Sequence, residues 1–405
     1  MNNSSINKIK IDFDKSHGSY IFDLNTNKEY LDMMGMYSTL AVGYNNLDVF
    51  KDLDNNFLLN LFRNKITNCE INSELLQEFI SVFHKYLDLN GSFPLSYFCP
   101  TGALAIEAAV KTALRFKSIS RPRILSFKGS FHGVYGYGGI LTDRFDSVAP
   151  RLKDFPGGYF NLINPYYDEI KSGHLNTTSF EKSIQVLKEE FIKDSSLAAV
   201  IVEPIQCTFG DQYIDLNYLK VIRSLCDEFN VPLIFDEIQT GFYTSGKRWY
   251  SEVLNIYPDI IVFGKKLQVA GILISNKCNK IFEIPSTLEA TWDSTLIDMY
   301  RSKIIIEQVS NNNTEELIMA NSKFIENELC NYSGVLNFRS CGYLISFDLI
   351  DNPNRNQFVQ ILKLNGVLCN PTREKSVRFR PQLLASKNDV DKLVSEIKKS
   401  LNTIK

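Results

Sequence analysis

The sequence lacks several features that would assign it to a particular class of protein. Its 405 residues include only four histidines, and the eight cysteines form no CxxC pair, so no metal site is expected. The formal net charge of −2 gives no electrostatic basis for binding nucleic acid or an anionic membrane. The longest apolar runs, such as LAAVIV at 197–202, are too short for a membrane span, and the N-terminal stretch lacks the apolar segment of a signal peptide. We therefore expect a cytoplasmic protein with reduced cysteines and with no nucleic-acid, membrane or metal partner.

Short apolar segments alternate with amphipathic helical patterns through the middle of the chain. The segments expected to contain strands are 123–127, 197–204, 231–241 and 258–266. Helices are expected within 96–117, after a short strand-like start and a turn, and at 215–230. In the first of these, the apolar residues that share one face are Ile106, Ala109, Val110, Ala113 and Leu114. Continuously apolar strands separated by helices are typical of a parallel sheet covered on both faces, so we expect an α/β fold.

The length of the chain favours one large and one small domain. Because no linker rich in proline and glycine divides the sequence, we expect the small domain to combine both ends of the chain. The expected large domain spans 45–285, and the small domain spans 1–44 and 286–405. Within the second part, SNNNTEE at 310–316 is expected to be a loop that caps the following helix, and 387–405 the last helix.

Charged residues follow three of the expected strands at their carboxyl ends, where sites in parallel sheets gather. Glu203, Asp236 and the pair Lys265 and Lys266 should therefore lie along one edge. A strand-end lysine that is desolvated or close to another cation loses its proton more readily and becomes a nucleophile able to form a Schiff base. The alternative is a lysine pair whose ammonium groups lie in solvent.

Asp236 ends the apolar strand LIFD, and a carboxylate at a buried strand end needs a partner. Backbone amides are one possible partner. The other is the protonated pyridine nitrogen of pyridoxal phosphate, which needs that proton to accept electrons. Ile238, two residues on, would then pack beneath the cofactor ring.

Two further segments have the small and aromatic residues that a phosphorylated aromatic cofactor requires. In CPTGALAIE (99–107), the amides of Gly102 and Ala103 open a helix, which suits a phosphate. In GSFHGVYGYGG (129–139), Phe131 or His132 would cover an aromatic ring by stacking, or else be a core aromatic and a hydrogen-bonded histidine. Neither segment matches GxGxxG or GxxxxGK[ST], so a dinucleotide or nucleoside triphosphate is not indicated.

In this order the segments resemble the class III family of pyridoxal-phosphate aminotransferases, and within it the lysine 6-aminotransferase branch. The similar stretches cover nearly the whole chain and include GALAIE, SFHG, VEPIQ, LIFDEIQTG, PDIIVFGKK, ATW and SVRFRP. The resemblance implies the type I, aspartate-aminotransferase-like fold, with a mostly parallel sheet in a large domain and a smaller α+β domain. It also implies a homodimer with shared active sites, acting on an amine or amino acid and an oxo acid.

The resemblance gives individual residues specific roles. Lys265 would hold the cofactor as a Schiff base and move the proton, with Lys266 as its neighbour. Asp236 would pair with the pyridine nitrogen and Gln239 would contact the phenolic oxygen, while Thr291 would reach the phosphate in the neighbouring chain. The residues expected to bind the cofactor, from the motifs and the resemblance together, are Gly102, Ala103, Phe131, His132, Glu203, Asp236, Ile238, Gln239, Lys265 and Thr291.

The substrate side departs from the family pattern. Arg378 in SVRFRP matches an arginine that binds a substrate carboxylate, a task that suits the planar guanidinium. However, Val134 stands where the lysine branch has an arginine after FHG, and Thr208 stands where the family has a glutamate that can pair with the carboxylate-binding arginine. The turns TWDS and PTGA also replace the family's TWGG and EGGA. The ring-binding residues thus match the family, whereas the substrate-binding residues are altered.

Three functions fit these observations. The first is transamination from a lysine-like terminal amine to an oxo acid such as 2-oxoglutarate, with Lys265 and Asp236 as the catalytic residues. The second keeps the cofactor but uses it for decarboxylation, elimination, racemisation or cyclisation of an amino acid in specialised metabolism. The third is a protein that binds the cofactor or a partner without catalysis, which the retention of Lys265, Asp236 and Gln239 disfavours.

Overall fold

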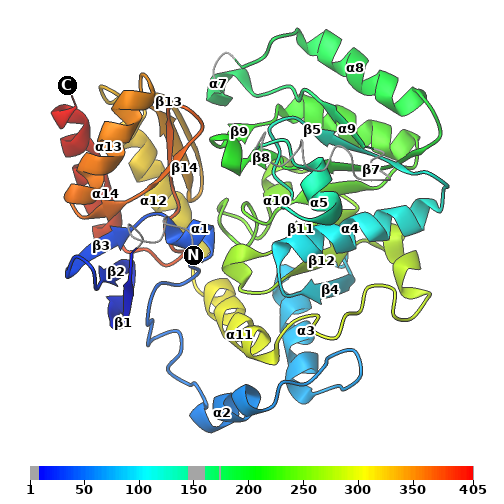
Figure 1. Cartoon of the computed structure of the whole chain (residues 1–405), viewed down its shortest axis with the longest axis horizontal. Helices are drawn as coiled ribbons and strands as arrows, with labels where there is room; N and C mark the ends of the chain where they lie inside the picture. The colour runs from blue at the N-terminus through cyan, green and yellow to red at the C-terminus, as the bar shows by residue number, and fades with distance from the viewer. Residues whose placement is uncertain (1–8, 145–159, 173–174, 405) are drawn as a thin grey trace. The chain divides into compact units, whose positions relative to one another are not determined.

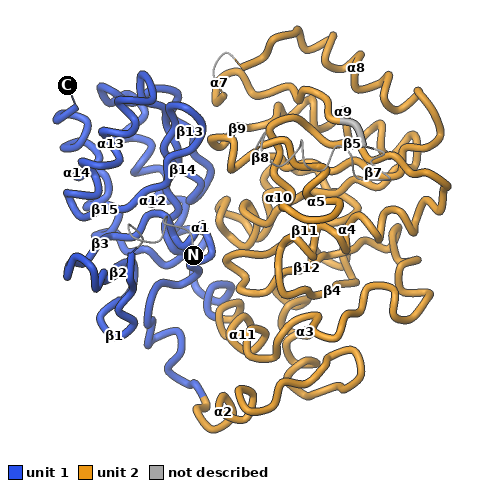
Figure 2. The backbone as a smooth tube through the Cα atoms, viewed as in Figure 1, with its two compact units in different colours: residues 1–53, 308–405 blue, residues 54–307 orange. Residues whose placement is uncertain are grey.

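The structure, a computed structural model, describes residues 9–144, 160–172 and 175–404 of the chain (Figure 1). These residues form two compact units, one of 1–53 with 308–405 and the other of 54–307 (Figure 2). The units change at 53/54 and 307/308, whereas the sequence analysis placed the boundaries at 44/45 and 285/286. On its C-terminal side the larger unit extends further and includes most of helix α11 (Leu296–Asn311), whose Lys303 Nζ lies 2.5 Å from Glu78 Oε2 of α3 (Glu74–Leu87), whereas on its N-terminal side it begins later.

A seven-stranded sheet of order β4-β12-β11-β10-β7-β5-β6 forms the centre of the larger unit. Its strands are β4 (Leu95–Cys99), β5 (Arg123–Phe127), β6 (Phe160–Ile163), β7 (Leu197–Val202), β10 (Leu233–Asp236), β11 (Ile260–Phe263) and β12 (Ala270–Ile274). Strand β12 runs antiparallel to both of its neighbours, and all the other neighbouring pairs are parallel. The expected α/β fold with a mostly parallel central sheet is thereby confirmed.

Helices cover both faces of this sheet because alternate strand residues point to opposite sides. On one face, the expected apolar face of α4 (Gly102–Lys117) packs against a cluster that contains Ile201 and Ile234. On the other face, α8 (Phe180–Ile192) and α9 (Leu216–Glu228) pack against a cluster that contains Val200 and Leu233. These clusters are the core that fixes the strand ends. The unit's remaining elements are α2 (Asn55–Arg63), α5 (Gly136–Leu141), α7 (Glu169–Ser172), β8 (Ile205–Gln206), η2 (Cys207–Phe209), β9 (Gln212–Tyr213), α10 (Tyr250–Leu254), η3 (Lys265–Leu267) and η4 (Asn276–Phe282).

The smaller unit joins the two ends of the chain in one sheet. Strand β15 (Val367–Leu368) pairs in parallel with β3 (Lys28–Asp32), which extends the hairpins of β1 (Ile11–His17), β2 (Tyr20–Asp23) and β3. A second, antiparallel sheet has the order β13-β14-β17-β16. The unit's other elements are α1 (Gly35–Ser38), α12 (Thr314–Leu329), β13 (Leu336–Cys341), β14 (Leu344–Asp348), α13 (Asn352–Leu364), β16 (Asn370–Thr372), β17 (Ser376–Phe379) and α14 (Lys387–Thr403).

The loop expected at 310–316 is much shorter in the structure. Helix α11 continues to Asn311, and α12 begins at Thr314, so only two residues separate the helices. The side chain of Asn313 makes no capping hydrogen bond. The prediction was wrong because asparagine and serine, although favoured in turns, are tolerated in the last turn of a helix.

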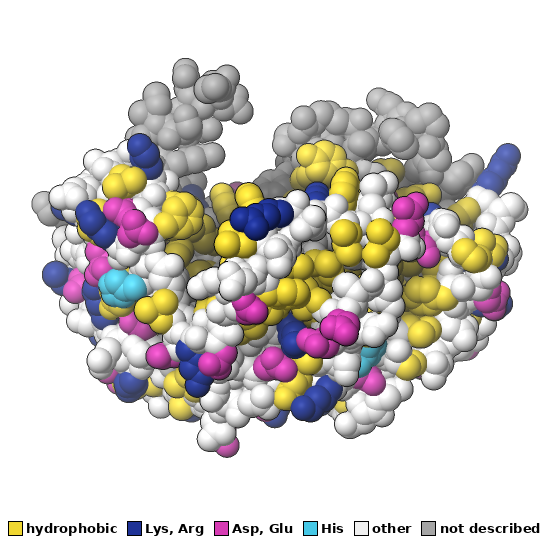
Figure 3. All heavy atoms as spheres, turned by 90° about the horizontal axis from the view of Figure 1, so that it is seen from below, with side chains coloured by type: hydrophobic (Ala, Val, Ile, Leu, Met, Phe, Trp, Pro, Cys, Tyr) yellow, Lys and Arg dark blue, Asp and Glu magenta, His cyan; other side chains and the backbone are white. Residues whose placement is uncertain are grey.

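Helix α2 leaves its apolar side chains exposed. None of its nine residues is buried, and Phe57 and Phe62 expose 36% and 76% of their surface. On the face of the molecule seen from below, hydrophobic side chains gather among charges of both signs (Figure 3). Phe57 still packs edge-on against Tyr300 of α11, with 5.4 Å between the ring centres, so the helix is covered in part within the chain. Exposed apolar side chains gathered on one helix are typical of an interaction surface.

Three features bear on the classes considered in the sequence analysis. All eight cysteines lie within the described residues, and each is a free thiol. The described residues contain no group of three or more histidine, cysteine or acidic side chains that could hold a metal ion. In this same part of the chain, no helix is long and apolar enough to cross a membrane.

Candidate active site

Four adjacent parallel strands deliver the predicted residues to one edge of the central sheet. Strands β11, β10, β7 and β5 lie next to one another in that order. Beyond their carboxyl ends lie, in the same order, Lys265, Asp236, Glu203 and the pair Phe131 and His132. Residues far apart in the sequence therefore meet at this edge, as the strand pattern predicted.

Asp236 has two partners. Its Oδ2 lies 2.9 Å from Nδ1 of His132, and its Oδ1 accepts a hydrogen bond from the amide of Ile238 at 3.1 Å. Both members of the His132–Asp236 pair are buried. Of the alternatives open for His132, the structure has the hydrogen-bonded histidine, which orients the Asp236 carboxylate. His132 Nε2 is also buried, with no hydrogen-bond partner among the described residues.

Glu203 is the second buried carboxylate at the edge. Its Oε1 accepts the amide of Phe131 at 2.6 Å, and the amide of Cys207 also donates to it. Burial and the nearby charge of Asp236 raise the pKa of Glu203 well above its ordinary value, while the Phe131 amide and Lys265 act in the opposite direction. Lys265, Glu203 and Asp236 thus form one electrostatic group.

The two lysines differ in their surroundings. Lys265 opens η3 with a φ of 49°, a left-handed conformation that is uncommon for a long side chain. Such strain is concentrated at functional sites, where the surrounding fold holds it. Lys266 is only 1% exposed, so the alternative of two lysines with their ammonium groups in solvent does not hold for it.

Glu237, next to Asp236, takes part in the fold rather than in this edge. Its carboxylate accepts the amides of Tyr250 and Ser251 at 2.5 and 2.9 Å, at the start of α10. Burial raises the pKa of Glu237 to about 7, against an ordinary value of 4.5. Asp236 therefore belongs to the group at the sheet edge, whereas Glu237 holds the start of α10.

The start of α4 has backbone amides that its capping residue does not bind. Thr101 caps the amide of Leu104 rather than those of Gly102 and Ala103, which also open the 16-residue helix. A Cβ atom on Gly102 would lie 2.9 Å from Cδ1 of Ile238, so only glycine fits there without displacing that side chain.

These residues fit pyridoxal phosphate. The oriented Asp236 carboxylate suits a ring nitrogen, and the open helix start suits a phosphate. The Oε1 atom of Gln239 is also buried without a hydrogen-bond partner among the described residues, which leaves it available to a ligand. Lys265 supplies the amine that such a cofactor needs.

On the substrate side, an arginine that the sequence analysis did not single out lies beside Thr208. Nε of Arg144 donates to the carbonyl of Thr208 at 2.6 Å, and its guanidinium lies 5.8 Å from the ring centre of Phe209. Val134 is 43% exposed. No motif marks Arg144, because its contact joins segments 64 residues apart.

The two remaining predicted residues are Arg378, which belongs to the smaller unit, and Thr291, which lies in a loop of the larger unit. Arg378 is buried on β17 of the smaller unit, opposite Ser346 of β14. Thr291 is exposed in the loop between η4 and α11.

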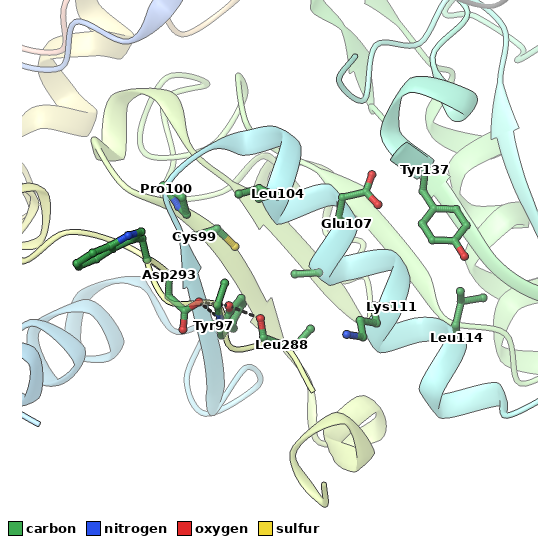
Figure 4. Close-up of a pocket in the computed structure, with 13 residues that line it drawn as sticks. Tyr97, Cys99, Pro100, Leu104, Glu107, Lys111, Leu114, Tyr137, Leu288 and Asp293 are labelled. Atoms are coloured by element: carbon green, nitrogen blue, oxygen red, sulfur yellow. Dashed lines mark hydrogen bonds between the residues drawn. The ribbon is translucent and has the colours of Figure 1, made fainter. Parts of the chain in front are cut away.

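A cavity of about 340 Å³ lies beside α4 and contains none of the residues expected to bind the cofactor (Figure 4). Its lining is mainly apolar, with the carboxylates of Glu107 and Asp293. The hydroxyl of Tyr97 donates to Asp293 Oδ1 at 2.7 Å. The sequence analysis did not single out Glu107, although it lies within the matched stretch GALAIE.

Comparison with known proteins identifies the family. The family described as aminotransferase class-III matches residues 1–401. The L-lysine-epsilon aminotransferase of Mycobacterium tuberculosis is 29% identical, over 98% of this chain and 92% of the relative. The enzyme of the same name from Streptomyces clavuligerus is 27% identical, over 97% and 91%.

A solved structure extends the similarity to three dimensions. The lysine aminotransferase from M. tuberculosis, in its internal aldimine form, superposes with a TM-score of 0.90 at 28% identity, covering 100% of this chain and 97% of that one. The match of the family over nearly the full length, together with this fold, establishes the type of enzyme. The chain belongs to the class III aminotransferases and is a pyridoxal-phosphate-dependent aminotransferase.

Proposed function

We propose that the protein transfers an amino group from the terminal amine of a lysine-like amino acid, or a similar amine, to an oxo acid such as 2-oxoglutarate. The relatives named as lysine aminotransferases, at 27–29% identity, support the choice of donor. The observation that carries the proposal is the buried pair of His132 and Asp236, beside Glu203 and Lys265 at one sheet edge.

In this proposal, bound pyridoxal phosphate supplies an electron-accepting ring. Nζ of Lys265 holds the cofactor and moves the proton at the reacting carbon. The Asp236 carboxylate keeps the ring nitrogen protonated, and Gln239 contacts the phenolic oxygen. Ile238 and Phe131 pack against the two faces of the ring.

Two further contacts complete the proposed cofactor site. The amides of Gly102 and Ala103, at the positive end of α4, bind the phosphate. Glu203 supports the site electrostatically, close to Lys265 and Asp236.

The substrate side follows from three residues. Arg378 binds a substrate carboxylate through its planar guanidinium. Because Val134 and Thr208 replace an arginine and a glutamate, the carboxylate of the substrate is held differently from that of the lysine relatives. We therefore expect a donor or acceptor that differs from theirs in the position of its carboxylate.

We also propose a cytosolic homodimer whose active sites are shared. The exposed side chains of Leu59 and Phe62 on α2 support a second chain as their cover. The exposure of Thr291 is compatible with a reach to the neighbouring cofactor. The eight free thiols are typical of a reducing compartment.

An amine screen read by the cofactor spectrum tests the proposed reaction. The holo-protein is mixed with lysine, ornithine, 4-aminobutyrate and simple diamines in the absence of any oxo acid. Conversion of the cofactor to its amine form, reversed by 2-oxoglutarate, is the expected result. Turnover of an amino acid without an acceptor would instead establish decarboxylation, elimination, racemisation or cyclisation and overturn the proposal.

A further inference from the structure

Glu107 joins helix α4 to the start of helix α5. Its Oε1 accepts the amide of Gly138 at 2.9 Å, and the amide of Tyr137 also donates to the carboxylate. Gly136 has a φ of 48°, and a Cβ atom there would lie 2.7 Å from both carboxylate oxygens. In Figure 4 the carboxylate points away from α4 toward the side of Tyr137. The backbone of α5 therefore approaches Glu107 as closely as glycine allows.

The start of α5 is in turn fixed to the segment that carries His132. A Cβ atom on Gly138 would lie 2.4 Å from the carbonyl oxygen of His132, so the two backbones are in direct contact. The hydroxyl of Thr142 accepts the amide of His132 at 2.8 Å and lies 2.8 and 2.9 Å from the carbonyl oxygens of Gly133 and Gly138. Residues 131–142 thus form one closed piece of backbone.

Helix α4, which carries Glu107, also carries the expected phosphate site at its start. Ala103 lies one turn before Glu107 on α4, and a Cβ atom on Gly133 would lie 3.5 Å from the Cβ of Ala103. Residues 131–142 therefore lie against α4 at Ala103, Ile106 and Glu107. The contact at Ala103 is an ordinary van der Waals one, whereas the contact at Glu107 is held by charge-assisted hydrogen bonds.

We infer that Glu107 is a positioning residue for the cofactor: by holding the start of α5, it fixes the 131–142 backbone and so places Phe131 and His132 relative to the phosphate site on α4. The charge of the carboxylate suits the positive end of a helix. Burial raises the pKa of Glu107, while the two amides oppose that rise, as expected for an anchor partly removed from water. The inference rests on the cofactor site described above but not on the choice of substrate.

Glu107→Gln tests the inference, because the amide keeps the shape of the side chain but loses the charge and one acceptor. We expect the dissociation constant of pyridoxal phosphate, measured by equilibrium dialysis of the cofactor-free protein, to rise about tenfold. The visible circular dichroism of the bound cofactor should also change, since the ring lies against Phe131. The matched control is Lys111→Met, one turn further along α4 and on the same cavity, where the ammonium of Lys111 donates to the carbonyl of Thr287 rather than holding the start of α5.

Amide hydrogen exchange of the cofactor-free variant separates positioning from general stability. Faster exchange confined to 131–142, with weaker cofactor binding, would support the inference. Unchanged affinity and dichroism in folded Glu107→Gln would overturn it and leave the proposed function intact. If Glu107→Gln does not fold, Gly136→Ala, which pushes a methyl group onto the carboxylate, must weaken cofactor binding in the same way or the inference fails. A wild-type protein that binds no pyridoxal phosphate would refute the cofactor site itself.

Discussion

His132, in the loop after β5, and Asp236, at the end of β10, are 104 residues apart, yet Nδ1 of His132 lies 2.9 Å from Oδ2 of Asp236. An ionised carboxylate can only accept, so Nδ1–H of His132 is the donor of this hydrogen bond and Oδ2 of Asp236 is its acceptor. The other carboxylate oxygen is held by the Ile238 amide. A strand end, a loop and the turn after the strand thus fix one carboxylate before any ligand binds.

Replacing His132 should release that carboxylate. In His132→Ala, Asp236 keeps only the amide of Ile238, so its orientation toward the ring nitrogen is lost. We expect the rate of the first half-reaction with an amine to fall about 10- to 100-fold, since a hydrogen bond to a charged group contributes about 1.5–3 kcal/mol. Stopped-flow absorbance measures this rate. A rate within twofold of wild type would show that the pair has no part in the chemistry.

Lys265 and Lys266 should differ in their chemistry. Borohydride reduction of the holo-protein should attach the cofactor to Lys265 and not to Lys266, as read by mass spectrometry of the peptides. Lys265→Ala should lower the half-reaction rate at least about a thousandfold, because the amine that holds the cofactor and moves the proton is removed. Lys266→Met should still form the adduct on Lys265. An adduct on Lys266 in the wild-type protein would contradict the assignment.

Gly102 should be required for cofactor binding rather than for folding. Alanine would place its Cβ 2.9 Å from Cδ1 of Ile238, and the displaced side chain would then occupy the space of the ring. We expect Gly102→Ala to weaken cofactor binding about tenfold and Ile238→Val, which removes Cδ1, to restore much of it in the double variant. Equal affinities for the single and double variants would place the defect elsewhere.

Restoring the family residues should change substrate use. Val134→Arg with Thr208→Glu should raise the kcat/KM for 2-oxoglutarate about tenfold, because a guanidinium and a switchable carboxylate return to the substrate side. Arg144 lies beside Thr208 and would attract the new carboxylate. Adding Arg144→Met should therefore increase the effect. If none of these variants changes kcat/KM for lysine or 2-oxoglutarate, our account of the substrate side is wrong.

Glu237 should make stability depend on pH. Its pKa is about 7 in the folded protein and 4.5 ordinarily, so between these values the folded state binds more protons than the unfolded state. The contribution of Glu237 to the free energy of unfolding should therefore be largest below pH 4.5, decrease as the pH rises to about 7 and level off above, by about 3 kcal/mol at most. Urea unfolding of the cofactor-free protein against Glu237→Gln measures this, and equal slopes in the two proteins would exclude Glu237 as the source.

The sequence predicted strands β5, β7, β10 and β11 of the central sheet because these four are mostly apolar, but it did not predict β6 or β12. Strand β5 spans the predicted 123–127, and the apolar face of α4 is the one that packs on the sheet. The edge position of Glu203, Asp236 and Lys265 followed from the rule that parallel strands end on the same side. A strong local pattern and a simple topological rule were sufficient for these features.

Contacts between distant segments were beyond local patterns. The bond between Arg144 and Thr208 and that between Glu107 and Gly138 depend on how loops fold back, which no periodicity encodes. The left-handed turn at α1, with φ between 49° and 69° at Met36, Tyr37 and Ser38, also contradicts the preferences of those residues. Such conformations are imposed by tertiary contacts, so the structure is needed to find them.

Asp236 and Glu237 are neighbours in the chain, but Asp236 is needed for the reaction and Glu237 for the fold. If chemistry were abandoned, Asp236 would become dispensable, whereas Glu237 would still be needed to hold the amides of Tyr250 and Ser251 at the start of α10. An acidic pair at this strand end in a related chain is therefore stronger evidence that the fold is retained than that the chain is catalytic. A histidine at the position of His132 is the more informative sign of catalysis, because its contact in this structure is with the Asp236 carboxylate that it orients.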